Sequence, residues 1–106
     1  MKPFQTRFDA MGTPTVAANL SDSRHVVVLT AGTPKTVAVP AGARTVLINA
    51  TGPVWVQYAA AAALPIADQL DGHAAELNPA MRDITGIASL DLVAPADCAA
   101  SIAFYG

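Results

Sequence analysis

Three short runs of β-forming residues, separated by two turns rich in glycine and proline, lie between Lys35 and Tyr58. The runs cover residues 35–39, 44–49 and 54–58, and the turns read Pro40-Ala41-Gly42 and Ala50-Thr51-Gly52-Pro53. Runs of this length are too short for helices, and such turns usually join strands. The segment therefore predicts a β-meander, and it contains no residues typical of a catalytic motif.

The C-terminal third has the clearest alternation of apolar and polar residues. In residues 84–93, Leu90 and Leu92 alternate with Asp91, and in residues 98–105, Ile102 and Phe104 oppose Ser101 and Tyr105. Each run therefore predicts a strand with one buried face. The connection Ala94-Pro95-Ala96-Asp97 has the length and composition of a hairpin turn.

Together with residues 25–30, these runs make about six strands separated by short turns. No helix-length periodic segment lies between them, so the fold class predicted is all-β: a small antiparallel β-sandwich or barrel. The 106 residues fit one domain. We expect an irregular N-terminal arm over residues 1–20 and a single domain over residues 21–106.

The connection over residues 59–83 is much longer than the roughly 4–6 residues that usually join strands. Several apolar residues in it, including Ile66, Leu70 and Met81, are expected to pack, so the sequence predicts an ordered excursion rather than disorder. A helical turn is expected near residues 74–77, ended by Asn78-Pro79.

The N-terminal arm carries two aromatic residues, Phe4 and Phe8, on either side of Arg7. They can fold back on their own domain, or they can reach a neighbouring subunit or scaffold. The second possibility makes Phe4, Arg7 and Phe8 candidate partner-binding residues.

Composition excludes several classes of partner. Charged residues make up only 13% of the chain, about half the usual share, which suggests that part of the surface is buried against other chains. The six basic residues never form a run, so direct nucleic-acid binding is not expected. No segment approaches the ~18–20 apolar residues of a membrane span.

Cys98 is the only cysteine, so no internal disulfide can form, and we expect it to be a small buried apolar residue.

The polar residues do not form a recognisable catalytic or metal-binding pattern. Asp68, Asp71 and Glu76 are the only carboxylate cluster, but their spacing does not match a calcium loop. The two histidines, His25 and His73, leave too few partners for a zinc site. We therefore expect a protein that is not an enzyme and needs no cofactor and no metal.

Two further groups have more than one interpretation. Trp55 and Tyr58 alternate onto opposite faces of one strand, where core or interface packing is favoured over a carbohydrate site assisted by Gln57. The pair Arg82-Asp83, which follows Asn78-Pro79, either holds a local turn by side-chain hydrogen bonds or forms an ion pair between subunits.

The turn and strand pattern of residues 35–106 resembles small structural proteins encoded in the head gene clusters of tailed bacteriophages. The matching segments are Val39-Pro40-Ala41-Gly42-Ala43, Ala50-Thr51-Gly52-Pro53, Asp71-Gly72, Glu76-Leu77-Asn78-Pro79, Arg82, Gly86 and Ile102-Ala103-Phe104-Tyr105. The resemblance implies a β-sandwich virion component, foremost a capsid decoration (cement) protein that binds the outer shell, often as a trimer.

The expected function is therefore structural. The partner would be the major capsid protein, the chain would form a homo-oligomer with a trimer favoured, and the protein would be made in the host cytoplasm and lie on the capsid surface. The candidate partner-binding residues are Phe4, Arg7, Phe8, Asn78, Arg82 and Asp83. Two alternatives stay open: another virion role, in a tail, fibre or head-completion component, or a small carbohydrate- or ligand-binding sandwich.

Overall fold

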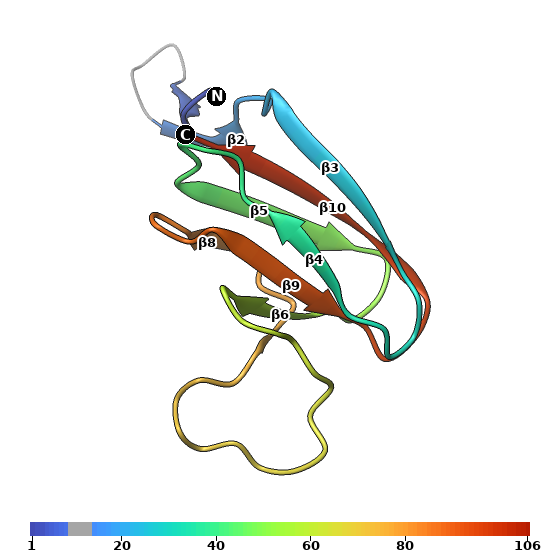
Figure 1. Ribbon diagram of the computed structural model, residues 1–106. Coiled ribbons are helices and arrows are strands. Elements are labelled where there is room, and N and C mark those ends of the chain that lie inside the picture. The colour runs from blue at the N-terminus through green and yellow to red at the C-terminus, as the bar shows by residue number, and fades with distance from the viewer. Residues whose placement is uncertain (9–13) are drawn as a thin grey trace.

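The computed structural model describes residues 1–8 and 14–106, and only the backbone of residues 7, 8 and 14–17. It is an all-β protein in which two four-stranded antiparallel sheets pack face to face (Figure 1). No helix occurs in these described ranges. The prediction of a small antiparallel β-sandwich is thus confirmed.

Each sheet is built from strands that are distant in the sequence. The first sheet has the order β3-β10-β5-β8, with bounds Ser23–Leu29, Cys98–Tyr105, Thr45–Ala50 and Met81–Asp83. The second has the order β4-β9-β6-β7, with bounds Lys35–Ala38, Ser89–Val93, Trp55–Tyr58 and Glu76–Leu77. The inner strands are thus β10 and β5 in the first sheet and β9 and β6 in the second.

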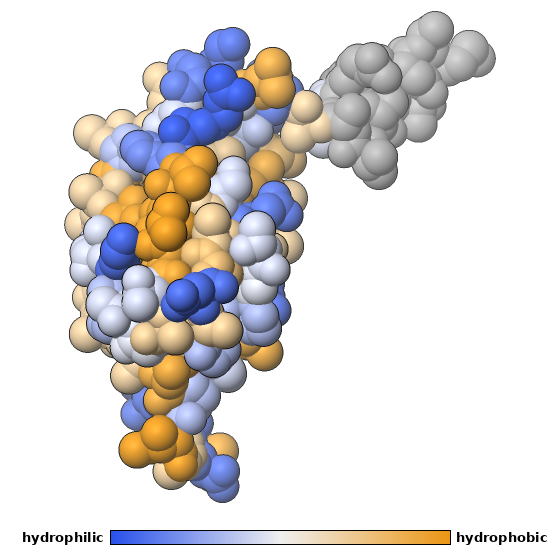
Figure 2. Space-filling model, turned by 90° about the vertical axis from the view of Figure 1, so that its right-hand side faces the viewer, coloured by the Kyte–Doolittle hydropathy of each residue, from blue (hydrophilic) through white to orange (hydrophobic). Residues whose placement is uncertain are grey.

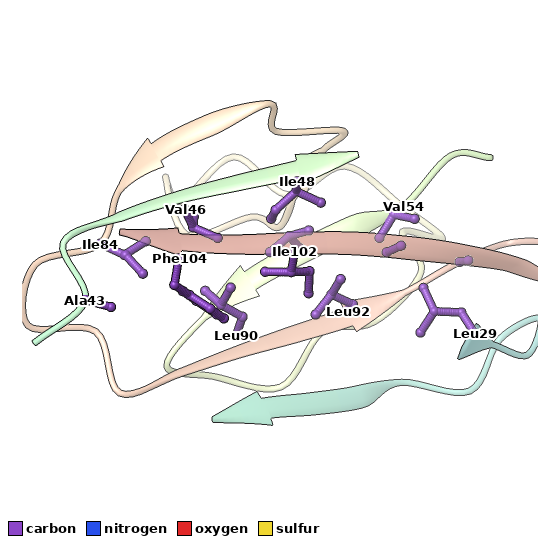
Figure 3. Packing of buried hydrophobic residues seen from close by; sticks show 13 residues of the cluster. Leu29, Ala43, Val46, Ile48, Val54, Ile84, Leu90, Leu92, Ile102 and Phe104 are labelled. Carbon is purple, nitrogen blue, oxygen red and sulfur yellow. The ribbon is translucent and has the colours of Figure 1, made fainter. Parts of the chain in front are cut away.

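The core lies between these inner strands. Ile102 and Phe104 from β10 meet Leu90 and Leu92 from β9, and all four side chains are fully buried (Figure 3). Leu29, Val46, Val54 and Ile84 complete the buried layer from neighbouring strands and their ends. Burial of apolar side chains between the two sheets is the main favourable contribution to folding.

The alternation read from the sequence places most side chains correctly, with two exceptions. Val54 and Val56 are buried as expected, but Asp91 and Tyr105, predicted on solvent faces, are also buried. Asp91 accepts hydrogen bonds from Thr36 and from the backbone amide of Ala62. Tyr105 is covered by the N-terminal segment, a contact that alternation within one strand cannot indicate.

The predicted strand pairings are wrong. The runs of the expected meander, now β4, β5 and β6, do not pair with one another, because β5 belongs to the first sheet and the other two to the second. The expected hairpin of β9 and β10 likewise joins strands of opposite sheets. A connection of four residues spans about 13 Å, which is enough to cross the ~10 Å between packed sheets. The same turn residues can therefore either close a hairpin within one sheet or carry the chain across to the other sheet.

The N-terminal arm, expected to be irregular, contains a small antiparallel sheet. Strand β1, Thr6–Phe8, pairs with β2, Pro14–Ala18, and the register is irregular between Thr6 and Phe8. No sustained alternation marks either strand in the sequence, so only the pairing defines them.

The expected helical turn near residues 74–77 does not form. Instead Glu76 and Leu77 make β7, which pairs with Val56 and Trp55 of β6. The pairing satisfies backbone groups that a single helical turn would leave open. Asn78 then ends the strand with a φ of 51°, in the left-handed region that asparagine tolerates.

The core makes a direct prediction about stability. Truncation of the fully buried ring in Phe104→Ala should lower the free energy of unfolding by about 3–5 kcal/mol, because the cavity is enclosed by both sheets. Urea unfolding followed by tryptophan fluorescence measures the change. Ser101→Ala, on the exposed face of the same strand, is the matched control and should leave stability nearly unchanged. An equal effect of the two variants would contradict the packing described.

Candidate functional site

The most prominent surface feature is the loop between β6 and β7, residues 59–75, which projects away from the two sheets (Figure 1). At its tip Ile66 and Leu70 are almost fully exposed, at 98% and 91% of their maximal area. The expectation that these residues pack within the chain is therefore wrong. The sheets already fill the core between them, and the loop tip extends beyond their edge.

Both ends of this loop are tied to the sandwich. The buried carboxylate of Asp91 accepts a hydrogen bond from the Thr36 hydroxyl at 2.8 Å and another from the amide of Ala62 at the loop's start. On the returning side, the Gln57 side-chain amide donates to the carbonyl of His73 at 2.8 Å. The loop that carries the apolar tip is therefore hydrogen-bonded to the sandwich on both sides of the tip, at Ala62 and at His73.

A shallow hollow lies between the loop and the sheet. Its volume is about 520 Å³, and it is lined by Trp55, Leu64, Ile66, Gln69, Ala74 and neighbouring loop residues. Trp55 is only half-buried, and its strand forms the sheet side of the hollow. Figure 2 shows the lower tip of the molecule, where this loop lies, with apolar side chains next to hydrophilic ones.

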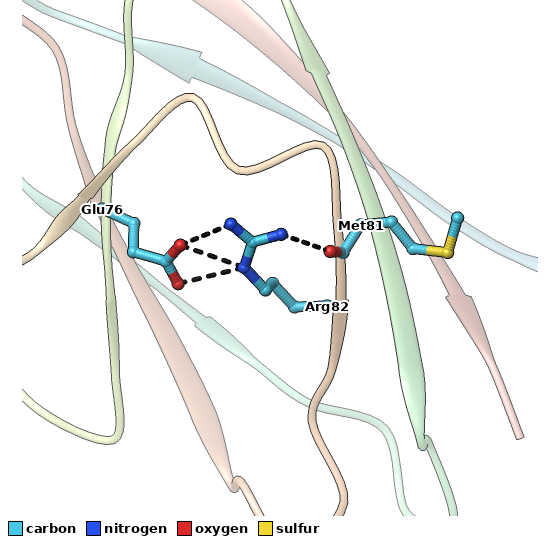
Figure 4. Close-up of polar contacts among 3 residues, drawn as sticks. All are labelled: Glu76, Met81 and Arg82. Carbon is cyan, nitrogen blue, oxygen red and sulfur yellow. Dashed lines mark hydrogen bonds and ion pairs between the residues drawn. The ribbon is translucent and has the colours of Figure 1, made fainter.

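After the loop, an ion pair joins the edges of the two sheets. Arg82 on β8 contacts both carboxylate oxygens of Glu76 on β7, with Nη2 2.6 Å and Nε 2.9 Å from Oε2 and Nε 3.2 Å from Oε1 (Figure 4). The remaining Nη1 donates to the Met81 carbonyl at 2.6 Å. A bidentate pair of this kind fixes the relative position of the two strands.

The surroundings of this pair shift two pKa values. The hydrogen bonds from Arg82 hold the pKa of the Glu76 carboxyl below its usual range, against a smaller opposing effect of burial. Burial, reinforced by the nearby Glu76 carboxylate, raises the pKa of Tyr58 far above its usual value. The Tyr58 hydroxyl itself is buried and outside hydrogen-bonding geometry with any described residue.

Asn78 and Asp83 stabilise turns on either side of β8. The Asn78 side-chain oxygen accepts from the Val54 amide at 2.8 Å, and the backbone amide of Asn78 donates to the Val54 carbonyl at 2.9 Å. Asp83 accepts from the Thr85 amide at 2.9 Å and hydroxyl at 2.7 Å, and these bonds lower the pKa of its carboxyl. Within one chain Asp83 thus holds a local turn, as one interpretation of Arg82-Asp83 expected, whereas Arg82 pairs with Glu76 on the other sheet.

The N-terminal segment folds against the C-terminus. The ring of Phe4 packs edge-on against Tyr105 with centroids 5.3 Å apart, and the Tyr105 hydroxyl donates to the Asn19 carbonyl at 2.7 Å. The amide of Gly106 also donates to the Lys2 carbonyl at 2.8 Å. Of the two possibilities for Phe4, the structure thus has the fold-back. The side chains of Arg7 and Phe8 lie outside the described residues.

Residues with catalytic or metal-binding potential do not gather at any point that the structure describes. Within residues 1–8 and 14–106 no group of three or more His, Cys, Asp or Glu side chains converges. Glu76 is paired with Arg82, while Asp71 accepts from the His73 amide. His25 lies edge-on against Phe104 at 5.4 Å. The described part of the chain also has no helix long and apolar enough to cross a membrane.

Compared with models of protein families, with curated proteins and with solved structures, the chain shows no significant match.

The residues that sequence reasoning missed are those of the loop tip. Ile66 and Leu70 were assigned to packing because they are apolar, although Pro65, Asp68 and Asp71 interrupt the segment. Isolated large apolar residues between a proline and carboxylates, without a helical or strand period, are the signal that could have indicated exposure.

The loop anchor can be tested at Asp91. Asp91→Ala should destabilise the fold by about 1–3 kcal/mol, because it leaves the Thr36 hydroxyl and the Ala62 amide without their acceptor. Hydrogen exchange should show a faster-exchanging Ala62 amide. Asp68→Ala, at an exposed position of the same loop, should change neither stability nor exchange.

The Glu76–Arg82 pair should contribute stability that depends on pH. Because the folded-state pKa of Glu76 lies below its ordinary value of 4.5, this contribution is present above that value and is lost as pH falls through the folded pKa. Glu76→Gln should therefore lower the midpoint of thermal unfolding slightly at pH 7 and have no effect in strong acid. The pair is half-exposed, so the shift is small.

The matched control places the same change in an Arg82→Gln background. There Glu76→Gln should no longer produce the pH-dependent difference, since its partner is absent. A difference of equal size in both backgrounds would show that Arg82 does not determine the behaviour of Glu76.

Proposed function

We propose that this protein is a structural virion component, foremost a capsid decoration protein that stabilises the head of a tailed bacteriophage by binding its outer surface. Its partner would be the major capsid protein, and its activity would be binding rather than catalysis.

The observation that carries the proposal is the exposure of Ile66 and Leu70 at the tip of a loop whose two ends are fixed. Large apolar side chains held in solvent by an anchored loop are suited to insertion into a pocket on a partner. Since the loop is held in the unbound chain, binding need not include the cost of ordering it.

Two further points support a role at the surface of an assembly. The chain is poor in charged residues, at 13%, which is typical of a surface partly covered by other chains. Residues 35–106 also resemble the small proteins of phage head gene clusters, which favours a homo-oligomer, with a trimer as the form implied by that resemblance. A tail, fibre or head-completion role would use the same apolar loop on a different virion surface.

The hollow beside Trp55 favours a second candidate, a small carbohydrate- or ligand-binding sandwich. It places a half-buried aromatic side chain next to Gln69 and an apolar loop wall. Gln57, the polar helper expected for such a site, is engaged with the His73 carbonyl. Because the Gln57 side-chain amide is already hydrogen-bonded within the chain, ligand binding is a weaker candidate than capsid binding.

Binding to phage heads can be tested with loop-tip variants. The proposal requires a tailed phage that encodes this chain, so heads of that phage purified without the protein are mixed with it and sedimented. The double variant Ile66→Asp/Leu70→Asp should lose at least about tenfold in affinity, because carboxylates cannot enter an apolar pocket without a partner. Electron microscopy of the decorated heads should show the protein at regular positions on the shell.

The control for this experiment is Ala41→Asp, which adds a carboxylate at an exposed turn between β4 and β5, distant from the loop. It should bind heads like the unmodified protein. Binding of the loop-tip variant at full strength would refute the proposed contact. Failure of the unmodified protein to bind any head, together with Trp55-dependent binding on a glycan array, would favour the ligand-binding candidate.

A further inference from the structure

Strand β3 forms an open edge of the first sheet. Its seven residues pair with β10 along their whole length, and β10 is its only neighbour in the sheet as described. β3 runs along the side of the molecule that faces the viewer in Figure 2, where an apolar patch interrupts the hydrophilic surface. A long β-branched edge of this kind is able to pair with another strand.

The directions of the backbone groups along β3 follow from its neighbour. The amide and carbonyl of Ala99 both bond to Thr51, so they point toward β5. Because direction alternates along a strand, Ala100 and Ile102 point toward β3, where they oppose Val27 and His25. The amides and carbonyls of the intervening β3 residues, Arg24, Val26 and Val28, therefore point out of the sheet.

The same three residues also carry the exposed side chains of β3. Val26 and Val28 are 74% and 64% exposed, and Arg24 is exposed as well, whereas Val27 and Leu29 pack toward the core. The outward-pointing carbonyl of Val28 already accepts a hydrogen bond from the Lys35 ammonium, at 2.6 Å. Within residues 1–8 and 14–106, the edge thus offers backbone groups without a strand partner together with apolar side chains.

We propose that a second copy of this chain occupies the edge, with β3 pairing antiparallel to β3 of its partner about a two-fold axis at Val26. Val26 of each copy would oppose Val26 of the other, and Arg24 would oppose Val28. The first sheets of the two copies would then form one continuous sheet. The backbone amide of Arg24 in one copy would replace the Lys35 ammonium as the donor to the Val28 carbonyl of the other.

Charge complementarity favours this occupant. In the paired arrangement, Arg24 of one copy lies beside the Val28 end of the other. The exposed carboxylate of Asp97 is held at that end by the amide of Ala31, at 2.8 Å. The Lys35 ammonium lies at the same end and would be displaced from the Val28 carbonyl by the pairing. Two-fold symmetry forms this contact twice, once at each end of the paired strands, and keeps the two arginines apart.

The inference names the contact by which copies would associate, and it does not depend on binding to a capsid. A two-fold contact differs from the three-fold arrangement that the phage resemblance implies. The dimer is tested with the free protein. A monomeric chain would therefore leave the proposal of capsid binding through the loop tip untouched, and a failure to bind capsids would not contradict the dimer.

Register-specific cross-linking tests the pairing. In a Cys98→Ala background, Val26→Cys should form a covalent dimer at equilibrium in a glutathione redox buffer. Directly opposed residues lie about 5.5 Å apart at Cα, within disulfide range. Val28→Cys is the matched control: it is similarly exposed, but the two copies of residue 28 would lie about 13 Å apart along the strand and should not cross-link.

Sedimentation of the free protein provides an independent measurement. The unmodified chain should show a monomer–dimer equilibrium. Val26→Lys should raise its dissociation constant at least about tenfold by opposing two ammonium groups across the axis. Met81→Lys, at an exposed apolar position on β8, the opposite edge of the same sheet, should leave the dimer unchanged.

Three outcomes would overturn the proposal. They are a strictly monomeric chain at all concentrations, a trimer or other oligomer insensitive to Val26→Lys, and cross-linking of Val28→Cys as complete as that of Val26→Cys. The cysteine variants keep the test decisive if the lysine variant folds poorly, because cysteine is small and neutral.

Discussion

Apolar side chains buried between the two sheets hold the sandwich together. Ile102 and Phe104 of β10 face Leu90 and Leu92 of β9, and the other residues of the core cluster pack around this contact. The layer is filled by residues from strands of both sheets. It leaves no room for the long loop between β6 and β7, whose apolar tip is therefore displayed in solvent.

The contacts at the two edges of the sandwich differ. On the side of β7 and β8, the bidentate ion pair between Glu76 and Arg82 links the sheets, and Asn78 adds hydrogen bonds to Val54. On the side of β3, the described contact at the edge is a single Lys35 ammonium on the Val28 carbonyl. The first side is closed by side chains of the same chain, whereas the second can accept another strand. This asymmetry favours association at β3.

The buried carboxylate of Asp91 lies on the face of β9 opposite Leu90 and Leu92 and connects the second sheet to the candidate binding loop. A buried carboxylate is unfavourable unless its oxygens are bonded, and Asp91 receives donors from Thr36 and from the amide of Ala62. The same bonds hold the start of the loop in place. Through this residue, the packing that stabilises the fold also fixes the surface that we propose for binding.

The all-β class, most strand positions and most buried faces follow from local patterns in the sequence, because alternation with a period of two and glycine- or proline-containing turns are local properties. On this basis Val54, Val56, Ile102 and Phe104 are all predicted on the buried face, where they lie. The pairing of strands does not follow from such patterns, since a four-residue turn can close a hairpin or cross to the other sheet. The burial of Asp91, which bonds to Ala62, and of Tyr105, which packs against Phe4, depends on residues distant in the chain, so alternation along one strand cannot indicate it. Glu76 and Arg82 are brought together because β7 and β8 form neighbouring edges of the two sheets, which is again a property of the tertiary structure.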